Sequence, residues 1–115
     1  MDIRRYDIVQ VDLSGAVGSE QGGIRPVLIL QNDIGNTFST TTIVAPFSSR
    51  LKSLNQPTHT LIKKSVDTGL KNDSVLLGEQ IRVISTQRII RKIGTVTDEK
   101  ERESIKRVYL ANFGN

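Results

Sequence analysis

The chain contains no cysteine and no tryptophan, and it has a single histidine. The absence of cysteine excludes a disulfide framework, a thiolate nucleophile and a cysteine-based metal site, and it favours a reducing compartment. With His59 alone, a mechanism that uses two histidines for two proton transfers is also excluded. A lone histidine in a short predicted strand is more often structural than catalytic, so we expect His59 to be structural.

Aromatic residues and long apolar runs are scarce as well. Two Tyr and three Phe cannot form a broad platform for stacking bases, so any nucleic-acid binding would depend on charge and hydrogen bonds. No signal peptide is recognisable, and no apolar run approaches the ~20 residues that span a bilayer. We therefore expect a cytoplasmic protein without a membrane partner. Asp, Glu and His do not cluster at metal-ligand spacing, so we expect neither a metal nor another cofactor.

The length of 115 residues suits one domain, residues 1–115, with a hydrophobic core of its own. Sixteen Lys and Arg against twelve Asp and Glu give a formal net charge of +4. This balance favours a polyanionic partner but does not specify one.

Hydrophobic patterning predicts a series of short strands. They are expected at residues 6–13, 26–31, 40–45, 58–62, 74–84 and 91–96. The strand at 26–31 is apolar on both faces and should be central, whereas Gly78 inside the fifth strand indicates a bulge or a bend. Residues 32–36 are rich in turn formers, residues 47–57 read as a surface loop, and residues 85–88 could form one helical turn.

A single longer helix is predicted near the C-terminus. Asp98 and Glu101 resemble a capping box, and the helix should continue to about Asn112. Its narrow inner stripe comprises Ile105, Val108, Tyr109 and Asn112. The pattern as a whole predicts a mainly β (α+β) fold, in which a small twisted antiparallel sheet closes into a partial barrel with the helix on one flank.

The segment 14–24 connects the first two predicted strands and contains four glycines. So many glycines exclude a helix and let backbone amides approach a bound group closely. A connection of this length is usually functional or mobile. Glu20 and Arg25 flank its glycine pair, which outlines a site containing an acid and a base. The alternative is an exposed ion pair in a surface loop, which would contribute little.

The run from Gly18 to Asn36, GSEQGGIRPVLILQNDIGN, resembles the signature segment of the MazF/PemK family of toxin endoribonucleases from bacterial toxin-antitoxin pairs. The likeness extends along nearly the whole chain and is closest to the Gram-positive branch. It continues through Pro57-Thr58-His59, Asp73-Ser74-Val75 and Glu79-Gln80-Ile81-Arg82. The resemblance implies an SH3-like partial barrel of the CcdB/MazF type, in agreement with the strand pattern.

In this family an arginine of the Gly-Gly-x-Arg-Pro motif and a threonine after the third strand form the catalytic pair, and the matching residues are Arg25 and Ser48. Serine at position 48 keeps the hydroxyl of the family's threonine but lacks the methyl group that restricts χ1. The neighbouring Ser49 could take the role of Ser48. Guanidinium is a poor proton carrier. In RNA cleavage we therefore expect Arg25 to stabilise the charged phosphorane that forms when the ribose 2′-oxygen attacks the phosphate. Glu20 is then the candidate base for the 2′-hydroxyl, although it could equally be a loop ion-pair partner.

Other polar residues could place the substrate, since amides and backbone groups can read the edges of unstacked bases in single-stranded RNA. The candidates are Ser19, Gln21, Gly22, Arg50, Lys52, Glu79, Gln80 and Arg82. Arg82 could instead be a charge at the rim of a strand.

The resemblance implies the toxin of a type II toxin-antitoxin system, a sequence-specific, metal-independent endoribonuclease. It would cleave single-stranded mRNA by 2′-hydroxyl attack to leave 2′,3′-cyclic phosphate and 5′-hydroxyl ends, with UACAU as the site expected from the branch. It also implies a homodimer with sites along its interface, and a MazE-like antitoxin that covers them with an acidic segment. Two alternatives remain: a gyrase-poisoning toxin on the same fold, and a catalytically inactive RNA-binding barrel.

Overall fold

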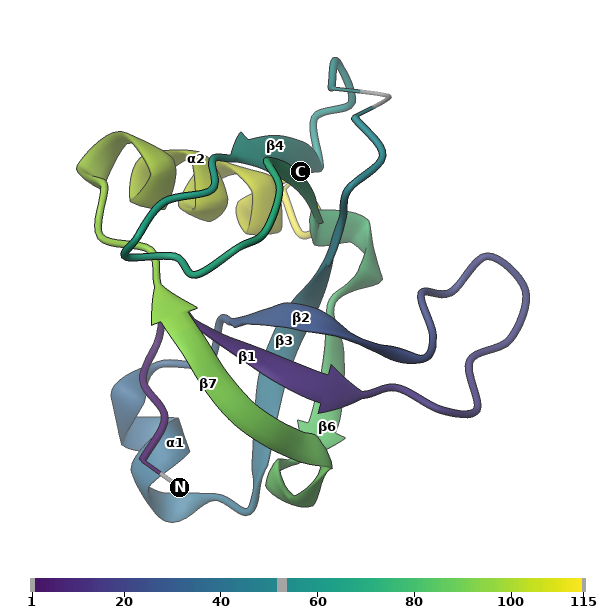
Figure 1. Ribbon diagram of the computed structural model, residues 1–115, viewed down its shortest axis with the longest axis vertical. Helices are drawn as coiled ribbons and strands as arrows, with labels where there is room; N and C mark the ends of the chain where they lie inside the picture. The colour runs from purple at the N-terminus through teal and green to yellow at the C-terminus, as the bar shows by residue number, and fades with distance from the viewer. Residues whose placement is uncertain (1, 52–53, 115) are drawn as a thin grey trace.

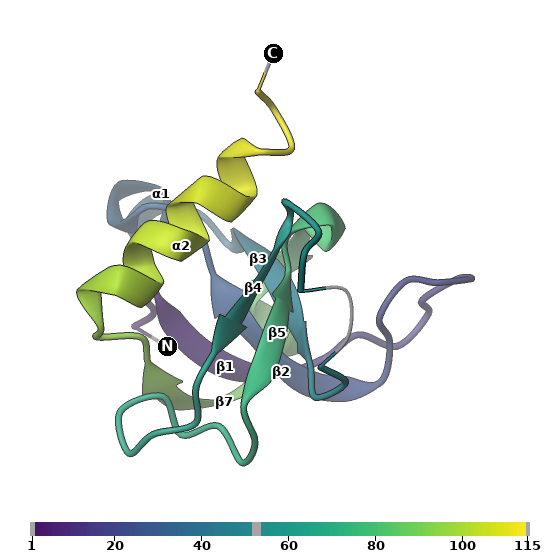
Figure 2. The same ribbon diagram turned by 90° about the horizontal axis from the view of Figure 1, so that it is seen from above.

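The computed structural model describes residues 2–51 and 54–114, in which seven strands form an antiparallel sheet with a helix packed across it (Figures 1 and 2). The strands are β1 Asp7–Asp12, β2 Ile24–Ile29, β3 Thr41–Ser48, β4 His59–Ile62, β5 Ser74–Leu77, β6 Arg82–Ser85 and β7 Ile89–Thr95. The helices are α1 Asp33–Phe38 and α2 Glu99–Leu110, with 3-10 turns η1 Gly78–Gln80 and η2 Thr86–Arg88. The predicted fold class is confirmed. Lys52, a candidate for substrate placement, lies outside the described residues.

The long strand β3 organises the sheet because it has different neighbours along its length. β2 pairs with one edge of β3, while β6 and β5 pair in turn with the first and second halves of its other edge. Neighbouring strands of the sheet follow the order β4-β5-β3-β2-β1-β7, with β6 beside β3 off this path. β2 is therefore central, as predicted. This arrangement brings the ends of β2, β3 and β5 close together.

Gly78 marks the point where the predicted strand 74–84 is broken into β5 and β6 by η1. A Cβ atom on Gly78 would lie 2.2 Å from Cγ1 of Val108 and 2.6 Å from the carbonyl oxygen of Thr58. Only glycine fits between these neighbours, so the turn can dock against both α2 and the start of β4. The bend predicted at Gly78 is therefore present, and the single strand predicted there was wrong.

The sheet buries apolar side chains on both faces. Ile8 and Leu28 are register partners in a cluster that includes Ile105 of α2. Val9 and Val27, one step along the same strands, belong to a second cluster. Because both clusters are closed to solvent, β1 and β2 form a rigid support for the residues at their ends.

The helix α2 begins at the predicted cap. The Asp98 carboxylate accepts a hydrogen bond from the backbone N–H of Glu101 at 2.9 Å. Glu101 does not bond back to Asp98; its carboxylate accepts from the backbone N–H of Lys63 at 2.9 Å, so half of the capping box forms. After the helix, the Asn112 amide donates to the carbonyl oxygen of Gly78 at 2.6 Å, which ties the end of the chain to η1.

Two local predictions were wrong. Residues 32–36 do not form a simple turn, because the Asn32 side chain accepts from the N–H of Gly35 and starts the short helix α1. The loop predicted at 47–57 begins two residues later, since β3 continues through Ser48. Phe47 is buried and pairs with Leu76 of β5, so burial extends the strand beyond its β-branched run.

Candidate active site

A cavity of about 500 Å³ lies where β2, β3, β4 and η1 meet. It is lined by Gln21, Arg25, Ser48, Ser49, Arg50, His59, Leu77 and Gln80. Five of the residues predicted from the sequence are therefore brought together, although they are up to 59 positions apart in the chain. Ser49, considered as a substitute for Ser48, lines the cavity as well, whereas His59 and Leu77 were not predicted to line it.

Arg25 lies in β2 and is held by the backbone. Its Nε donates to the carbonyl oxygen of Gly22 at 2.8 Å, and its Nη1 donates to the carbonyl oxygen of Phe47 at 3.1 Å. Burial lowers the pKa of the guanidinium below its usual value, but the group stays charged at neutral pH. In residues 2–51 and 54–114 the ion pairs are His59–Glu79 and Lys92–Asp7, so no described carboxylate neutralises Arg25. This charge is available to an anion.

Ser48 ends β3 beside Arg25, whose guanidinium contacts the preceding residue, Phe47. The Ser48 hydroxyl oxygen accepts from the backbone N–H of Arg50 at 3.2 Å. This contact uses a lone pair and leaves the hydroxyl proton free to donate. Ser49 is exposed and lines the same cavity, so two hydroxyl groups remain candidates for contacting a bound oxyanion.

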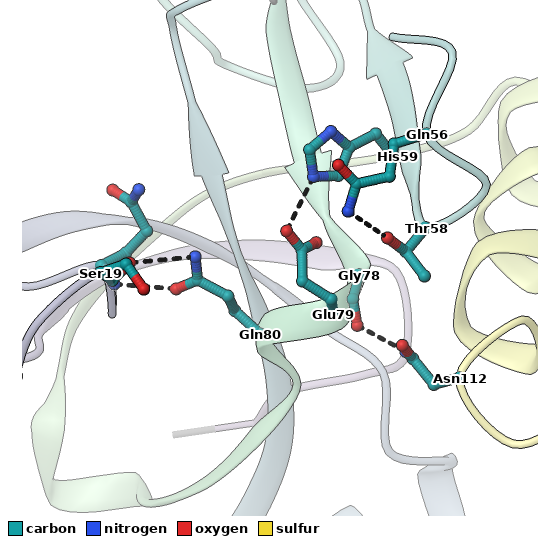
Figure 3. A network of polar contacts seen from close by, with 9 residues as sticks. Ser19, Gln56, Thr58, His59, Gly78, Glu79, Gln80 and Asn112 are labelled. Carbon is teal, nitrogen blue, oxygen red and sulfur yellow. Dashed lines mark hydrogen bonds and ion pairs between the residues drawn. The ribbon is translucent and has the colours of Figure 1, made fainter. Parts of the chain in front are cut away.

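The glycine-rich loop between β1 and β2 projects from the sheet (Figures 1 and 2) and is tied to η1 by Gln80. The amide oxygen of Gln80 accepts from the backbone N–H of Gln21 at 2.8 Å, and its amide nitrogen donates to the carbonyl oxygen of Ser19 at 3.3 Å (Figure 3). These two bonds bracket Glu20. The Gln80 amide, which we predicted to read bases, therefore holds the loop in this structure.

Glu20 is exposed and forms its contact within the loop. Its carboxylate accepts from the backbone N–H of Val17 at 2.7 Å, and it makes no ion pair with Arg25 in the described part of the chain. The ion pair that we considered as the simple alternative is therefore absent here. Neighbouring Gly22 contributes its carbonyl oxygen to Arg25, while Ser19 and Gln21 contact Gln80.

His59 is buried at the start of β4 and also lines the cavity. Its Nε2 lies 2.8 Å from Oε2 of Glu79, the middle residue of η1 (Figure 3). The contact fixes the imidazole against η1, and Glu79 does not itself line the cavity. In the sequence, His59 and Glu79 appear only in two separate motifs, Pro57-Thr58-His59 and Glu79-Gln80. Neither motif indicates that the two side chains contact each other.

Arg82 is not brought to this cavity. It lies in β6 and lines a different, more apolar hollow of about 800 Å³ with Ile81, Val83, Tyr109 and Phe113. Among the described residues there is no group of three or more His, Cys, Asp or Glu that could hold a metal ion. None of the helices in the described residues is long and apolar enough to span a bilayer.

The fold and the cavity define a small β-sheet protein with an unneutralised arginine beside hydroxyl groups. Comparison with known proteins identifies its family. Residues 4–110 match the family described as PemK-like, MazF-like toxin of type II toxin-antitoxin system. The chain is 50% identical over 99 residues to Endoribonuclease EndoA of Bacillus subtilis, covering 86% of this chain and 84% of that protein. The chain therefore belongs to the PemK/MazF toxin family, with a relative in a Gram-positive bacterium as the sequence predicted.

Solved structures share the fold at lower identity. MazF from Deinococcus radiodurans matches with a TM-score of 0.82 and 18% identity, covering 100% of this chain and 99% of that chain. A mycobacterial endoribonuclease in complex with its cognate antitoxin matches with a TM-score of 0.78 and 17% identity, over 97% of this chain and 95% of that chain. At these identities the likeness concerns the fold.

Proposed function

We propose that this chain is the endoribonuclease toxin of a type II toxin-antitoxin system and that it cleaves single-stranded mRNA without a metal ion. The observation that carries the proposal is the unneutralised guanidinium of Arg25 beside the Ser48 hydroxyl. A cation and a hydroxyl donor suit a phosphate that gains charge during reaction. The relation to Endoribonuclease EndoA supports RNA as the substrate.

The reaction follows from which bonds must form and break. A base removes the proton of the ribose 2′-hydroxyl, and the 2′-oxygen forms a bond to the adjacent phosphorus. Negative charge builds up on the phosphorane oxygens, where Arg25 and the Ser48 hydroxyl donate hydrogen bonds. The bond from phosphorus to the 5′-oxygen then breaks, and that oxygen takes up a proton. The products are a 2′,3′-cyclic phosphate and a 5′-hydroxyl end.

Glu20 is the proposed base, on a loop segment that Gln80 holds at the edge of the cavity. Its carboxylate contacts the backbone of Val17 in the free chain, so RNA binding must turn it toward the scissile ribose. If Glu20 is the base, Glu20→Gln should remove the acidic limb of the pH profile of cleavage. An unchanged acidic limb in that variant would exclude Glu20.

Substrate placement belongs in the proposal to the residues that surround Arg25. Arg50 is exposed on the cavity rim, where a guanidinium can contact a phosphate, and the backbone of the loop from Ser19 to Gly22 can approach a base closely. Sequence specificity, with UACAU as the expected site, would arise from these contacts.

We further propose that the whole chain, residues 1–115, is one toxin domain that acts as a homodimer in the cytoplasm. Exposed apolar side chains gather around the hollow that contains Arg82: Val83 is 60% exposed and Phe113 is 73% exposed. A second copy would cover them and bring Arg82 to the interface. Sedimentation of Val83→Asp should give monomers if this face is the interface, whereas persisting dimers would locate the interface elsewhere.

The proposed inhibitor is a MazE-like antitoxin with an acidic, partly extended segment. The net charge of +4 and the open charge of Arg25 favour such a partner. The relationship to a fold that was solved in complex with a cognate antitoxin supports it. An acidic antitoxin peptide should compete with RNA for the wild-type protein; simultaneous binding of both would place the antitoxin elsewhere.

The two alternatives make different predictions. A gyrase poison would inhibit DNA supercoiling and leave RNA intact, and an inactive barrel would bind RNA without cutting it. Membership of the PemK/MazF family and the relation to EndoA favour the endoribonuclease over both.

The test is cleavage of a fluorogenic RNA in EDTA, followed by analysis of the product ends. We expect cleavage to persist in EDTA and to leave 2′,3′-cyclic phosphate ends, because the nucleophile is carried by the ribose. An RNA with 2′-deoxyribose at the scissile position should bind without being cut. A strict requirement for Mg²⁺, or 5′-phosphate products, would contradict the mechanism.

A further inference from the structure

A second cavity of about 310 Å³ adjoins the candidate active site, because Arg25 and Ser49 line both. It is lined by Gln10, Arg25, Pro26, Phe47, Ser49, Gly69, Leu70, Lys71, Asn72, Ser74, Arg91 and Ile93. Its volume is at the lower end of the ~300–1,000 Å³ typical of ligand pockets. None of the mechanism above uses it.

The second cavity is cationic. Arg25, Lys71 and Arg91 line it, and no acidic residue does so among the described part of the chain. The ion pairs found in residues 2–51 and 54–114 involve none of these three cations. Like charges that are gathered without a counter-charge repel one another, so an anion bound between them is favoured.

The sheet sets the position of Arg91. Gln10 of β1 is the register partner of both Pro26 in β2 and Arg91 in β7. Register partners on adjacent strands project from the same face, so these three side chains form one row across the sheet. The row starts beside Arg25 and leads away from the candidate active site.

The connection between β4 and β5 sets the position of Lys71 and lies beside β7 (Figures 1 and 2). Gly69 has a φ of +68°, and a Cβ atom there would lie 2.0 Å from the carbonyl oxygen of Ile93. Only glycine allows the connection to approach β7 so closely. The backbone N–H of Thr95 also donates to the carbonyl oxygen of Asp67 at 2.8 Å. Lys71 therefore follows a segment that is fixed against the sheet.

We propose that this second cavity binds an RNA nucleotide just outside the cleaved UACAU core, with its phosphate on Lys71 and Arg91. The inference rests on the proposed endoribonuclease function. A strand whose scissile phosphate sits at Arg25 passes directly into the adjoining cavity, since Arg25 borders both. The apolar walls of Leu70 and Ile93 suit a base, and the side-chain amides of Gln10 and Asn72 can bond to its edge.

The experiment measures binding of uncut oligonucleotides by fluorescence anisotropy at several salt concentrations. The probes are UACAU with 2′-deoxyribose in this core, and the same core extended by three ribonucleotides at its 5′ or its 3′ end. The variant is Lys71→Gln/Arg91→Gln. The matched control is Lys100→Gln/Lys106→Gln, which removes the same charge from exposed positions on α2.

One of the two extended probes should bind wild type severalfold more tightly than the core does. Its salt dependence should be steeper by about 0.7 in log K against log salt, because one more phosphate of a single strand is neutralised. In Lys71→Gln/Arg91→Gln this advantage of the extended probe should disappear, whereas the control should keep it.

Equal binding of the core and both extended probes by wild type would overturn the proposal, as would an advantage that survives in Lys71→Gln/Arg91→Gln. Loss of affinity for an acidic antitoxin peptide alone, with RNA binding unchanged, would assign the cavity to the antitoxin and also overturn it. Failure of the proposed function is seen separately, as absent cleavage of all-ribose UACAU-containing RNA by wild type.

Discussion

On one side of the candidate active site, Arg25 is half-buried and hydrogen-bonded to the backbone carbonyl groups of Phe47 in β3 and of Gly22 in the loop just before β2. On the other side, the loop that carries Glu20 projects from the sheet and is tied to η1 through the side chain of Gln80. The support of Arg25 includes the sheet through Phe47, whereas the tie between the loop and η1 depends on the Gln80 side chain. We infer that the arginine side stabilises the phosphorane from a fixed position, and that the loop side, which carries the proposed base Glu20, adapts to the substrate.

The comparison predicts its largest effect at Arg25. Arg25→Ala should lower the rate of RNA cleavage by about 10² to 10³, the loss seen when a donor to a developing oxyanion is removed. Arg107→Ala removes the same charge from an exposed position on α2 and should cleave normally. Thermal unfolding followed by circular dichroism checks that both variants fold. Near-normal cleavage by folded Arg25→Ala would remove the central assignment.

A smaller effect is expected at Ser48. A neutral donor contributes about half the free energy of a charged one, so Ser48→Ala should lower the single-turnover rate roughly ten- to thirtyfold. Ser48→Thr should keep the rate or raise it modestly, because the added methyl group restricts χ1. Ser49→Ala is the control in the same cavity. If Ser49→Ala is impaired and Ser48→Ala is normal, the hydroxyl has been assigned to the wrong residue.

The smallest effect is expected on the loop side. Gln80→Ala removes both bonds to the loop and should raise the amide exchange rate of Gln21, each bond accounting for roughly a fivefold change. Gln80→Glu keeps the oxygen that accepts from Gln21 and loses the donor to Ser19, so it should give an intermediate rate. Exchange measured by NMR at the Gln21 amide decides this, and equal protection in all three proteins would show that Gln80 does not hold the loop.

The two sides also differ in how far the sequence could predict them. Arg25 lies in a continuous motif that was visible in the sequence, but the strand predicted at 26–31 begins two residues earlier, at Ile24, so that it includes Arg25. The contact of Gln80 with Gln21 joins residues 59 positions apart, and no local pattern specifies it. For the same reason the sequence did not show that the Gln80 side chain contacts the loop in the free chain.

The fold shows the same limit. The strands and the Asp98 cap depend on neighbouring residues and were predicted closely. The division of the predicted strand 74–84 depends on Val108 and Thr58, which crowd Gly78 from distant parts of the chain. Placement of Arg82 in a separate hollow follows from that division, because η1 redirects the chain between Glu79 and Arg82.

The most direct test of the account is the single-turnover cleavage rate as a function of protein concentration for wild type, Arg25→Ala and Gln80→Ala on one RNA. We expect Arg25→Ala to lose most of the maximal rate with a smaller change in the half-saturating concentration. Gln80→Ala should show the reverse, a raised half-saturating concentration with most of the maximal rate retained. If Arg25→Ala is impaired only in binding, or Gln80→Ala only in maximal rate, the division between a fixed side that stabilises the phosphorane and a substrate-adapting loop side is contradicted.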